Sequence, residues 1–286
     1  MKILFLCPNI VYYNVLMHDI SADKDITVKY DGRDFNFANA NISSYDIFIM
    51  IDSHLKPIRK TQGEDVLPQC KLQNKHTKFV LMCMNPLPDA QTAAQYAEIF
   101  DCITTVDWGD AQRYGFLYVH QIYSTLTQRS KIGYKSDICF IGREKGRDSI
   151  INAFYNLALK NGLRPDFSVY HGKNNRRYNK GAWMSYHDVL RRTLQSRCVL
   201  EILQTKQQGY TLRSIEAIAY NRLLITNNTL ITSNPYYSDR TMSVFTDKPF
   251  IDMKMFEVGN RPAYNYAHDY SPKRLIQMII EYLFDK

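Results

Sequence analysis

The chain has 286 residues, 45% of them hydrophobic and 22% charged, with a formal net charge of +8 at pH 7. This length is sufficient for two domains of ordinary size, each with its own core. The longest uninterrupted apolar run, residues 79–84, is far too short to span a membrane, and residues 2–7 lack the apolar length of a secretory signal. The sequence therefore predicts a soluble globular protein of the cytoplasm.

Residues 1–135 are predicted to form an α/β unit. Helical spacing of apolar residues occurs at about 11–20 and 89–99. These helices alternate with strand-like apolar runs, and such alternation predicts a mostly parallel sheet. The predicted strands are residues 2–7, 26–30, 47–51, 78–84 and 102–106.

Mostly polar residues follow the predicted carboxyl ends of these strands, where open parallel sheets bind their ligands. The residues are Pro8, Asn9, Asp52, Ser53, His54, Asn85 and Asp107. The first strand is followed by CPNIVYYN rather than by G-x-G-x-x-G, which argues against a dinucleotide-binding oxidoreductase. The six cysteines lie mostly in apolar runs without Cys-x-x-Cys spacing, so reduced core thiols are expected.

A second α/β unit is predicted from about residue 136. Its strands are expected near 137–142, 167–171, 198–202, 223–226 and 243–245. The first of them ends at Gly142 and is followed by Arg143, Lys145 and Arg147, which lead into a helical pattern at 150–159. Three cations at the carboxyl end of a strand suit a diphosphate, although cations in such a loop can also serve only to solvate it.

Residues 198–228 contain the most informative pattern of the chain, a strand, a polar loop with Gly209, a helix and another strand. The free amides at the start of that helix, with the helix dipole, favour an anion. Gln208, Gly209, Tyr210 and Thr211 are therefore expected to lie close to a phosphate, with Arg213 beside them. Glu216 lies one turn further along the same helical face, where its carboxylate can accept two ribose hydroxyls. The alternative is that Arg213 and Glu216 form an ordinary surface ion pair.

The stretch QQGYTLRSIEAIAYNRLLITNN resembles the donor-nucleotide motif of GT-B glycosyltransferases. In the retaining families two glutamates flank seven residues, and Glu216 matches the second, which binds the nucleotide ribose in that fold. Gln208 stands at the first position, which departs from the retaining pattern. The form Q-x-G-x-T-x-R-x-x-E at 207–216 is similar to small bacterial transferases of surface polysaccharide and lipopolysaccharide assembly. The resemblance also makes Arg143, Lys145 and Arg147 candidate ligands of the donor phosphates.

The resemblance implies an α/β protein of two Rossmann-like domains that face each other across a cleft, the GT-B architecture. Residues 1–135 would form the acceptor-side domain and residues 136–270 the donor-side domain, with the join in the polar segment 128–135. Residues 271–286 are expected to form a final helix, because Ser271 is suited to cap it and Pro272 to begin it. In this fold the final helix often packs back on the N-terminal domain.

The function that the resemblance implies is transfer of a sugar from a nucleotide diphosphate donor, with a UDP-sugar expected, to a growing bacterial surface glycan. The expected partners are this donor, a glycan or lipid-linked glycan acceptor, and the cytoplasmic face of the inner membrane as a peripheral contact. Two alternatives stay open. One is another nucleotide-sugar enzyme of this fold, such as an epimerase or hydrolase, and the other is a non-catalytic scaffold in glycan synthesis.

The surplus of positive charge lies entirely in the second half. Residues 1–135 hold 14 Lys or Arg and 14 Asp or Glu, whereas residues 136–286 hold 22 and 14. This fits a domain that binds a nucleotide diphosphate, and a basic face that can rest on anionic lipid. Nucleic-acid binding is not predicted, because the basic residues do not follow the pattern of a recognisable helix-turn-helix, RNA-recognition or zinc-finger motif. The densest basic patch consists of Lys173, Arg176, Arg177 and Lys180, interleaved with Tyr178 and Trp183.

An inverting transfer also needs a base that removes the proton from the acceptor hydroxyl. Asp52 and His54 are the predicted catalytic residues, although a hydrogen-bonding role at the surface fits His54 as well. Asp107 is a weaker candidate because its neighbours also suit a helix start. Asp23-Lys24-Asp25 has the Asp-x-Asp letters of metal-dependent transferases but precedes its strand. We therefore expect no metal ion and no cofactor.

Overall fold

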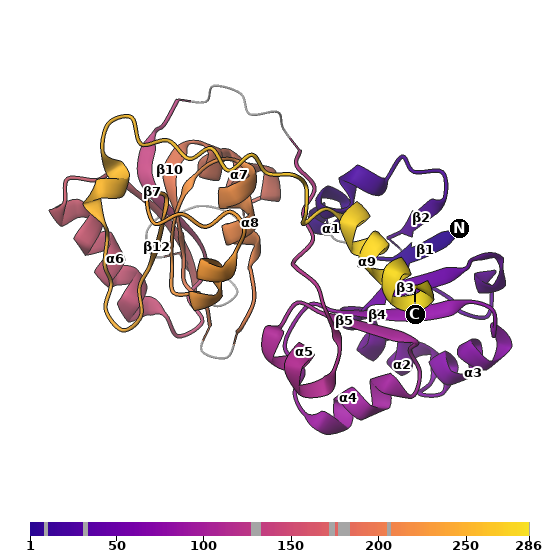
Figure 1. The fold of residues 1–286 in the computed structure, drawn as a ribbon. Coiled ribbons are helices and arrows are strands. Elements are labelled where there is room, and N and C mark those ends of the chain that lie inside the picture. Colours follow the sequence, from indigo (N-terminus) through magenta and orange to yellow (C-terminus); the bar gives the residue numbers. More distant parts are fainter. Residues whose placement is uncertain are drawn as a thin grey trace. The chain divides into compact units, whose positions relative to one another are not determined.

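The computed structural model describes residues 1–8, 11–30, 34–126, 133–171, 175–176, 184–204 and 207–285 (Figure 1). The chain divides into two compact units. Unit 1 contains residues 1–126 and 268–286, and unit 2 contains residues 127–267. Each unit has a six-stranded sheet and a hydrophobic core of its own.

The sheet of unit 1 has the strand order β2-β1-β3-β4-β5-β6, and every neighbouring pair is parallel. Its four central strands are largely buried, as expected for a parallel sheet covered on both faces, whereas the two edge strands are half-buried or partly exposed. The strands are β1 (Ile3–Leu6), β2 (Ile26–Lys29), β3 (Ile47–Ile51), β4 (Lys78–Cys83), β5 (Cys102–Thr105) and β6 (Leu117–Tyr118).

The helices of unit 1 include one from the far end of the chain. That helix, α9 (Pro272–Phe284), begins with Pro272 and is capped by Ser271, whose side chain accepts a hydrogen bond from the amide of Arg274. It contacts β5, so the last residues of the chain complete the unit that the first residues begin (Figure 1). The others are α1 (Val11–Leu16), α2 (Leu55–Gln62), α3 (Val66–Gln73), α4 (Ala90–Ala97), α5 (Trp108–Tyr114), and the short 3-10 turns His18–Ile20, Ile42–Ser44 and Asp52–His54.

Aromatic side chains fill the core on one face of this sheet. Phe48 of β3 packs edge-to-face on Phe79 of β4 at 5.3 Å between ring centroids, and Phe35 stacks on Phe48 at 6.1 Å. Ile58 of α2 and Leu67 of α3 join the same cluster. Burial of these side chains holds α2 and α3 against the sheet and fixes the loop that follows β3.

The sheet of unit 2 has the order β12-β11-β10-β7-β8-β9, parallel except for the last pair. Its elements are β7 (Ser136–Arg143), α6 (Asp148–Lys160), β8 (Pro165–His171), β9 (Asn175–Arg176), α7 (Tyr186–Leu194), β10 (Ser196–Glu201), α8 (Leu212–Ala219), β11 (Leu223–Thr226), β12 (Met242–Val244) and the 3-10 turns Thr229–Ser233 and Met253–Phe256.

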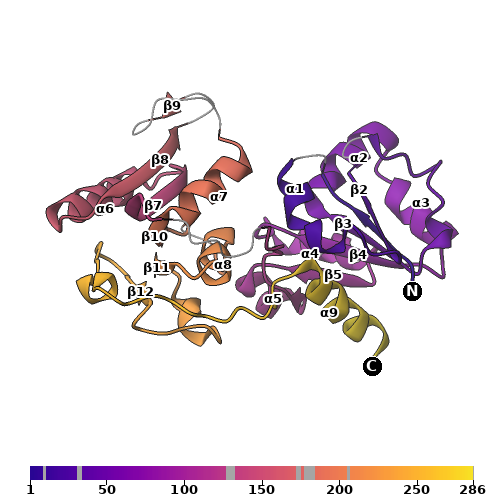
Figure 2. The ribbon, with the colours of Figure 1, turned by 90° about the horizontal axis from the view of Figure 1, so that it is seen from above.

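Helices cover both faces of this second sheet (Figure 1 and Figure 2). Phe154 of α6 packs with Phe140 and Phe167 in the core on one face. On the opposite face Arg192 of α7 pairs with Asp166 and donates to the hydroxyl of Ser168 at 2.6 Å. Because strand residues alternate between faces, α7 and α8 share the second face with every other residue of β7, β8 and β10.

The predicted strands of both halves are present within two residues of their expected ends, which confirms two parallel-stranded α/β units. The two short strands β6 and β9 and the helices α2, α3 and α7 were not predicted, and α5 was foreseen only as the alternative helix start beside Asp107. Six free, buried cysteines are present, as expected for core thiols. Within the described residues, no helix is long and apolar enough to cross a bilayer.

Candidate functional site

Both sheets have the same switch in strand order. In unit 1 the first strand, β1, lies between the second and the third, β2 and β3. In unit 2 the first strand, β7, likewise lies between β8 and β10. Open α/β sheets bind ligands at the carboxyl ends of the two strands where the order reverses. The topology therefore selects the residues after β1 and β3 in unit 1, and those after β7 and β10 in unit 2.

Strand β10 ends in Glu201, a carboxylate that is 2% exposed. Its Oε1 accepts a hydrogen bond from the hydroxyl of Thr211 at 2.5 Å, and its Oε2 accepts one from the hydroxyl of Thr226 at 2.5 Å. Burial raises the pKa of Glu201, while the hydroxyls that donate to it act in the opposite direction. Glu201 thus joins the start of α8 to the end of β11.

The loop before α8 is held in a conformation that requires glycine. Gly209 has a φ of 146°, a region that residues with side chains rarely adopt. Its carbonyl oxygen accepts a hydrogen bond of 2.9 Å from the buried side-chain amide of Asn228. Thr211 then caps α8, because its hydroxyl accepts from the amide of Arg213 at 3.0 Å. The predicted sequence of glycine loop, cap and helix is therefore present.

Glu216 of α8 is completely buried, with a side chain that is 0% exposed. Its Oε2 forms an ion pair with Arg213, which is 24% exposed. Its Oε1 accepts a hydrogen bond of 2.7 Å from the hydroxyl of Tyr186, the first residue of α7. Burial opposes the charge on Arg213, but the Glu216 carboxylate outweighs it and raises the pKa of the guanidinium. The two residues form the ion pair that was the alternative interpretation, with the Glu216 carboxylate buried rather than on the surface and Arg213 partly exposed.

The other predicted residues of this loop differ in exposure. Gln208 is exposed at the surface, whereas Tyr210 is buried. The hydroxyl of Tyr210 donates to the carbonyl oxygen of Leu230 at 3.3 Å, and burial raises the pKa of Tyr210. The side chain of Tyr210 therefore anchors the loop, and its backbone remains the part that the sequence assigns to a phosphate.

The basic loop after β7 contains cations in two different settings. Arg143 and Lys145 are exposed, and Lys145 has a φ of 45° beside Gly146 at 77°. Arg147 is half-buried, and burial lowers its pKa. Its guanidinium donates to three backbone carbonyl oxygens. These belong to Ile202, to Arg143 at a distance of 2.6 Å, and to Glu144 at a distance of 3.1 Å. Arg147 thus ties the end of β7 to the end of β10, across the point where the strand order reverses.

The carboxyl edge of the first sheet has a carboxylate in an unusual environment. Asp52 directly follows β3, and its Oδ2 accepts a hydrogen bond of 3.3 Å from the amide of Met84. Its Oδ1 is buried and has no hydrogen-bond partner within the described residues. Burial raises the pKa of Asp52 to about 6, although backbone amides that donate to it lower the pKa. A carboxylate with a pKa near the working pH is typical of proton transfer.

The other candidates of unit 1 lie close to Asp52 in sequence or along the same sheet edge. His54 is 2% exposed, so it is a buried residue and not a surface one. Asp107 is buried and caps α5, accepting from the amide of Asp110 at 3.0 Å, which is the helix-start role that its neighbours predict. Asp110 in turn accepts from the amide of Leu87 at 2.6 Å, and burial raises its pKa.

The remaining predicted features lie away from the two sheet edges or outside the described residues. Asp23 and Asp25 lie in a turn before β2, with the Asp25 amide donating to the Asp23 carboxylate at 3.0 Å. Among the described residues no group of three or more His, Cys, Asp or Glu side chains could hold a metal ion. The basic patch at 173–183 lies outside the described residues, apart from the backbone of Arg176. Most of the predicted join at 128–135 also lies outside them.

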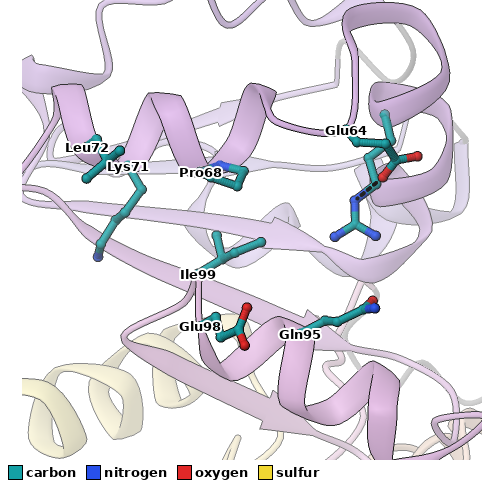
Figure 3. Close-up of a pocket in the computed structure, with 8 residues that line it drawn as sticks. Glu64, Pro68, Lys71, Leu72, Gln95, Glu98 and Ile99 are labelled. Atoms are coloured by element: carbon teal, nitrogen blue, oxygen red, sulfur yellow. Dashed lines mark ion pairs between the residues drawn. The ribbon is translucent and has the colours of Figure 1, made fainter.

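A surface hollow of about 440 Å³ in unit 1 contains none of the predicted site residues (Figure 3). It is bounded by α3, α4 and the end of α2, with Glu64 at one end and Lys71 at the other (Figure 3). Three of its four charged side chains form ion pairs, because Arg59 lies 3.5 Å from Glu64 and Lys71 pairs with Asp101, and the fourth is Glu98. This hollow therefore indicates no class of ligand.

Two side chains important to the geometry were missed by the sequence reasoning. Glu201 carried a signal, since a glutamate inside the apolar run CVLEIL must have buried partners. Tyr186 carried none, because it lies 30 residues before Glu216 and only the packing of α7 against α8 brings the two together.

Known proteins resemble this chain in structure but not in sequence. No family model and no curated protein matches the sequence. Solved structures that resemble it include an alpha-glucosyltransferase, and the chain shares with them the α/β fold of its two mostly parallel sheets.

One such structure is an alpha-glucosyltransferase in complex with UDP and a 13-mer DNA containing a central A:G mismatch. It has a TM-score of 0.51 and 12% identity, over 99% of this chain and 90% of that one. Another is a GtfA/B complex, with a TM-score of 0.51 and 12% identity, over 84% of this chain and 57% of that one. At this identity the likeness shows the fold and leaves the substrates to be proposed.

Proposed function

We propose that the protein is a glycosyltransferase that moves a sugar from a nucleotide diphosphate donor, with a UDP-sugar as the expected donor. The observation that carries the proposal is the arrangement at the carboxyl ends of β7 and β10. A capped helix, a glycine loop and exposed cations meet there, where the strand order reverses. The fold shared with an alpha-glucosyltransferase in complex with UDP supports the same conclusion.

In this proposal unit 2 binds the donor. The diphosphate lies against the amides at the start of α8 and against Arg143 and Lys145, which neutralise the charge that develops on the leaving group. Glu216 accepts the ribose hydroxyls, while Arg147 and Glu201 hold the two loops in place. Because basic side chains and helix amides stabilise the diphosphate, we propose a transfer without a metal ion.

Unit 1 supplies the base in this proposal. Asp52, with a pKa of about 6, is mostly ionised at neutral pH and can take the proton of an acceptor hydroxyl as the sugar is transferred. The buried His54 lies on the same turn, where it can position this carboxylate.

The acceptor proposed first is a bacterial surface glycan or its lipid-linked precursor, handled at the cytoplasmic face of the membrane. The form Q-x-G-x-T-x-R-x-x-E at 207–216 supports it through its likeness to small transferases of surface polysaccharides. A second candidate acceptor is DNA. Two observations favour it: the net charge of +8 and the DNA bound to the alpha-glucosyltransferase of the same fold.

The first test is a thermal-shift titration with UDP, GDP, CMP and dTDP. Stabilisation by one nucleotide is expected in the wild type. Glu216→Ala should weaken the binding of that nucleotide about tenfold or more, because it removes hydrogen bonds to a charged acceptor. Glu257→Ala, which removes an exposed carboxylate outside the site, is the matched control and should leave the affinity unchanged.

Other results separate the alternatives. A chain that responds to no nucleotide would favour the scaffold function over the transferase. Consumption of a nucleotide sugar without any acceptor would favour an epimerase or hydrolase. Transfer of labelled sugar to duplex DNA, and not to lipid-linked glycan, would show that DNA is the acceptor. Activity lost in EDTA and restored by magnesium or manganese would contradict the metal-free transfer.

A further inference from the structure

The carboxylate assigned to the ribose is covered in the free protein. Glu216 has no exposed side-chain surface, and both of its oxygens are engaged, one by Arg213 and one by Tyr186. A ligand can make a hydrogen bond only with an acceptor that it can reach within about 3.2 Å. A ribose therefore cannot bind to Glu216 until one of these two neighbours moves away.

The two neighbours differ in how easily they can leave. Arg213 lies on the same helix, three residues before Glu216, so the helix itself keeps the pair together. Tyr186 comes from a different helix and is the first residue of α7, where the backbone has fewer helical hydrogen bonds to restrain it. Its phenol donates a hydrogen bond of 2.7 Å to Glu216. Tyr186 is thus the neighbour that a ligand can displace.

We propose that Tyr186 is a built-in competitor of the nucleotide, whose hydroxyl occupies the place on Glu216 Oε1 that a ribose hydroxyl takes in the complex. The proposal rests on the nucleotide site proposed above and assigns a further residue to it. The exchange is balanced, because one hydroxyl donor to the carboxylate replaces another. The nucleotide gains only from a second ribose hydroxyl and from its phosphates.

This exchange lowers the affinity for every ligand by the same factor, since only the open fraction of the protein binds. A ligand with one hydroxyl and no phosphate forms one hydrogen bond to Glu216 but breaks the one from Tyr186, so the number of hydrogen bonds does not increase. The ranking of ligands is unchanged, but the contact sets a threshold of affinity that a nucleotide with both a vicinal diol and a diphosphate can pass and a ligand with one hydroxyl cannot. It also shields a buried carboxylate from water and small polyols when no donor is present.

The test is the affinity for UDP, or for whichever nucleotide stabilises the wild type, measured by isothermal titration calorimetry on three variants. Tyr186→Phe keeps the ring and removes the competing hydroxyl, so binding should tighten about three- to tenfold, where tenfold is about 1.4 kcal/mol. Tyr264→Phe is the matched control, because it removes a buried hydroxyl that donates to the carbonyl of Arg222 at the start of β11, and it should leave the affinity unchanged. Glu216→Ala reports on the site itself.

The outcomes are separable. Unchanged or weaker binding to Tyr186→Phe, with Glu216→Ala still impaired, would overturn the competition and leave the nucleotide site standing. Equal affinities of the wild type and Glu216→Ala would remove Glu216 from the site and overturn both proposals. Binding seen only with Tyr186→Phe would support both.

A double-mutant cycle of Tyr186→Phe and Glu216→Ala, read from the free energy of unfolding without nucleotide, tests the contact independently, because each variant removes one partner of the hydrogen bond. A coupling energy of zero would show that Tyr186 does not hold the carboxylate in the free protein, and would overturn the competition.

Discussion

The two sheets share one topology but treat their carboxylates in opposite ways. In unit 2 all four oxygens of Glu201 and Glu216 are engaged by hydroxyls or by a guanidinium. In unit 1 one oxygen of Asp52 is buried without a hydrogen-bond partner among the described residues, and its pKa rises to about 6. A carboxylate whose two oxygens both accept hydrogen bonds holds the structure or a ligand in place. A carboxylate with one buried oxygen that lacks a donor accepts a proton more readily.

This difference indicates different functions for the carboxyl edges of the two sheets. An unsatisfied buried polar atom costs stability, so its presence in a well-packed core calls for a functional reason. The edge of unit 2, by contrast, is a framework of paired groups in which a lost partner should mainly affect stability or binding.

The largest expected effect concerns turnover. Asp52→Asn removes the proposed base and should lower the rate of sugar transfer by about 10²- to 10⁴-fold. Nucleotide affinity should stay at the wild-type value, because the donor is assigned to unit 2. The measurement is steady-state transfer beside a calorimetric titration, with Asp65→Asn, an exposed aspartate of unit 1, as the control. A normal rate in Asp52→Asn would place the base elsewhere.

The next effect concerns the framework of unit 2. Glu201→Ala leaves two buried hydroxyls without their acceptor and creates a cavity, so the free energy of unfolding should fall by about 2 to 4 kcal/mol in urea denaturation. Glu201→Gln should be tolerated much better at neutral pH, because the raised pKa of Glu201 means that its charged form is the disfavoured one. Equal losses in the two variants would show that the charge itself holds the loop.

A third effect has a defined sign with pH. Because the folded state raises the pKa of Asp52 from 3.8 to about 6, folding takes up a proton between these values, and the contribution of Asp52 to stability falls as pH rises through this range. Asp52→Asn should therefore unfold with a free energy about 1 to 3 kcal/mol higher than wild type at pH 7. The gain should vanish below about pH 4. Urea denaturation at both pH values measures it, and an equal difference at the two would contradict the assigned pKa.

The smallest effect separates two cations of one loop. Lys145→Ala should weaken nucleotide binding only a few-fold, about 1 kcal/mol or less, because the side chain is exposed and screened by salt. Arg147→Ala should instead lower the free energy of unfolding by about 1 to 3 kcal/mol, since three carbonyl oxygens lose a charged donor. If Arg147→Ala changed affinity with no loss of stability, the guanidinium would be a phosphate ligand after all.

Much of the fold was accessible from the sequence because its strands are local patterns. The predicted strands at 47–51 and 78–84 match β3 and β4 almost to the residue, and Ser271 with Pro272 predicted the start of α9. The short strand β6 was missed because two half-buried residues carry no period. The order of residues at 207–216 likewise predicted a glycine loop, a cap and a helix.

The sequence by itself determined the two α/β units, the capped helix α8 and the places where charged residues follow strands, because these depend on neighbours in the chain. Only the tertiary structure decided what each charge contacts. It put Arg147 on the carbonyl oxygen of Ile202, Glu201 between two threonines and Tyr186 on Glu216. Those partners lie 10 to 55 residues apart, and strand order and helix packing, rather than local spacing, bring them within hydrogen-bond distance.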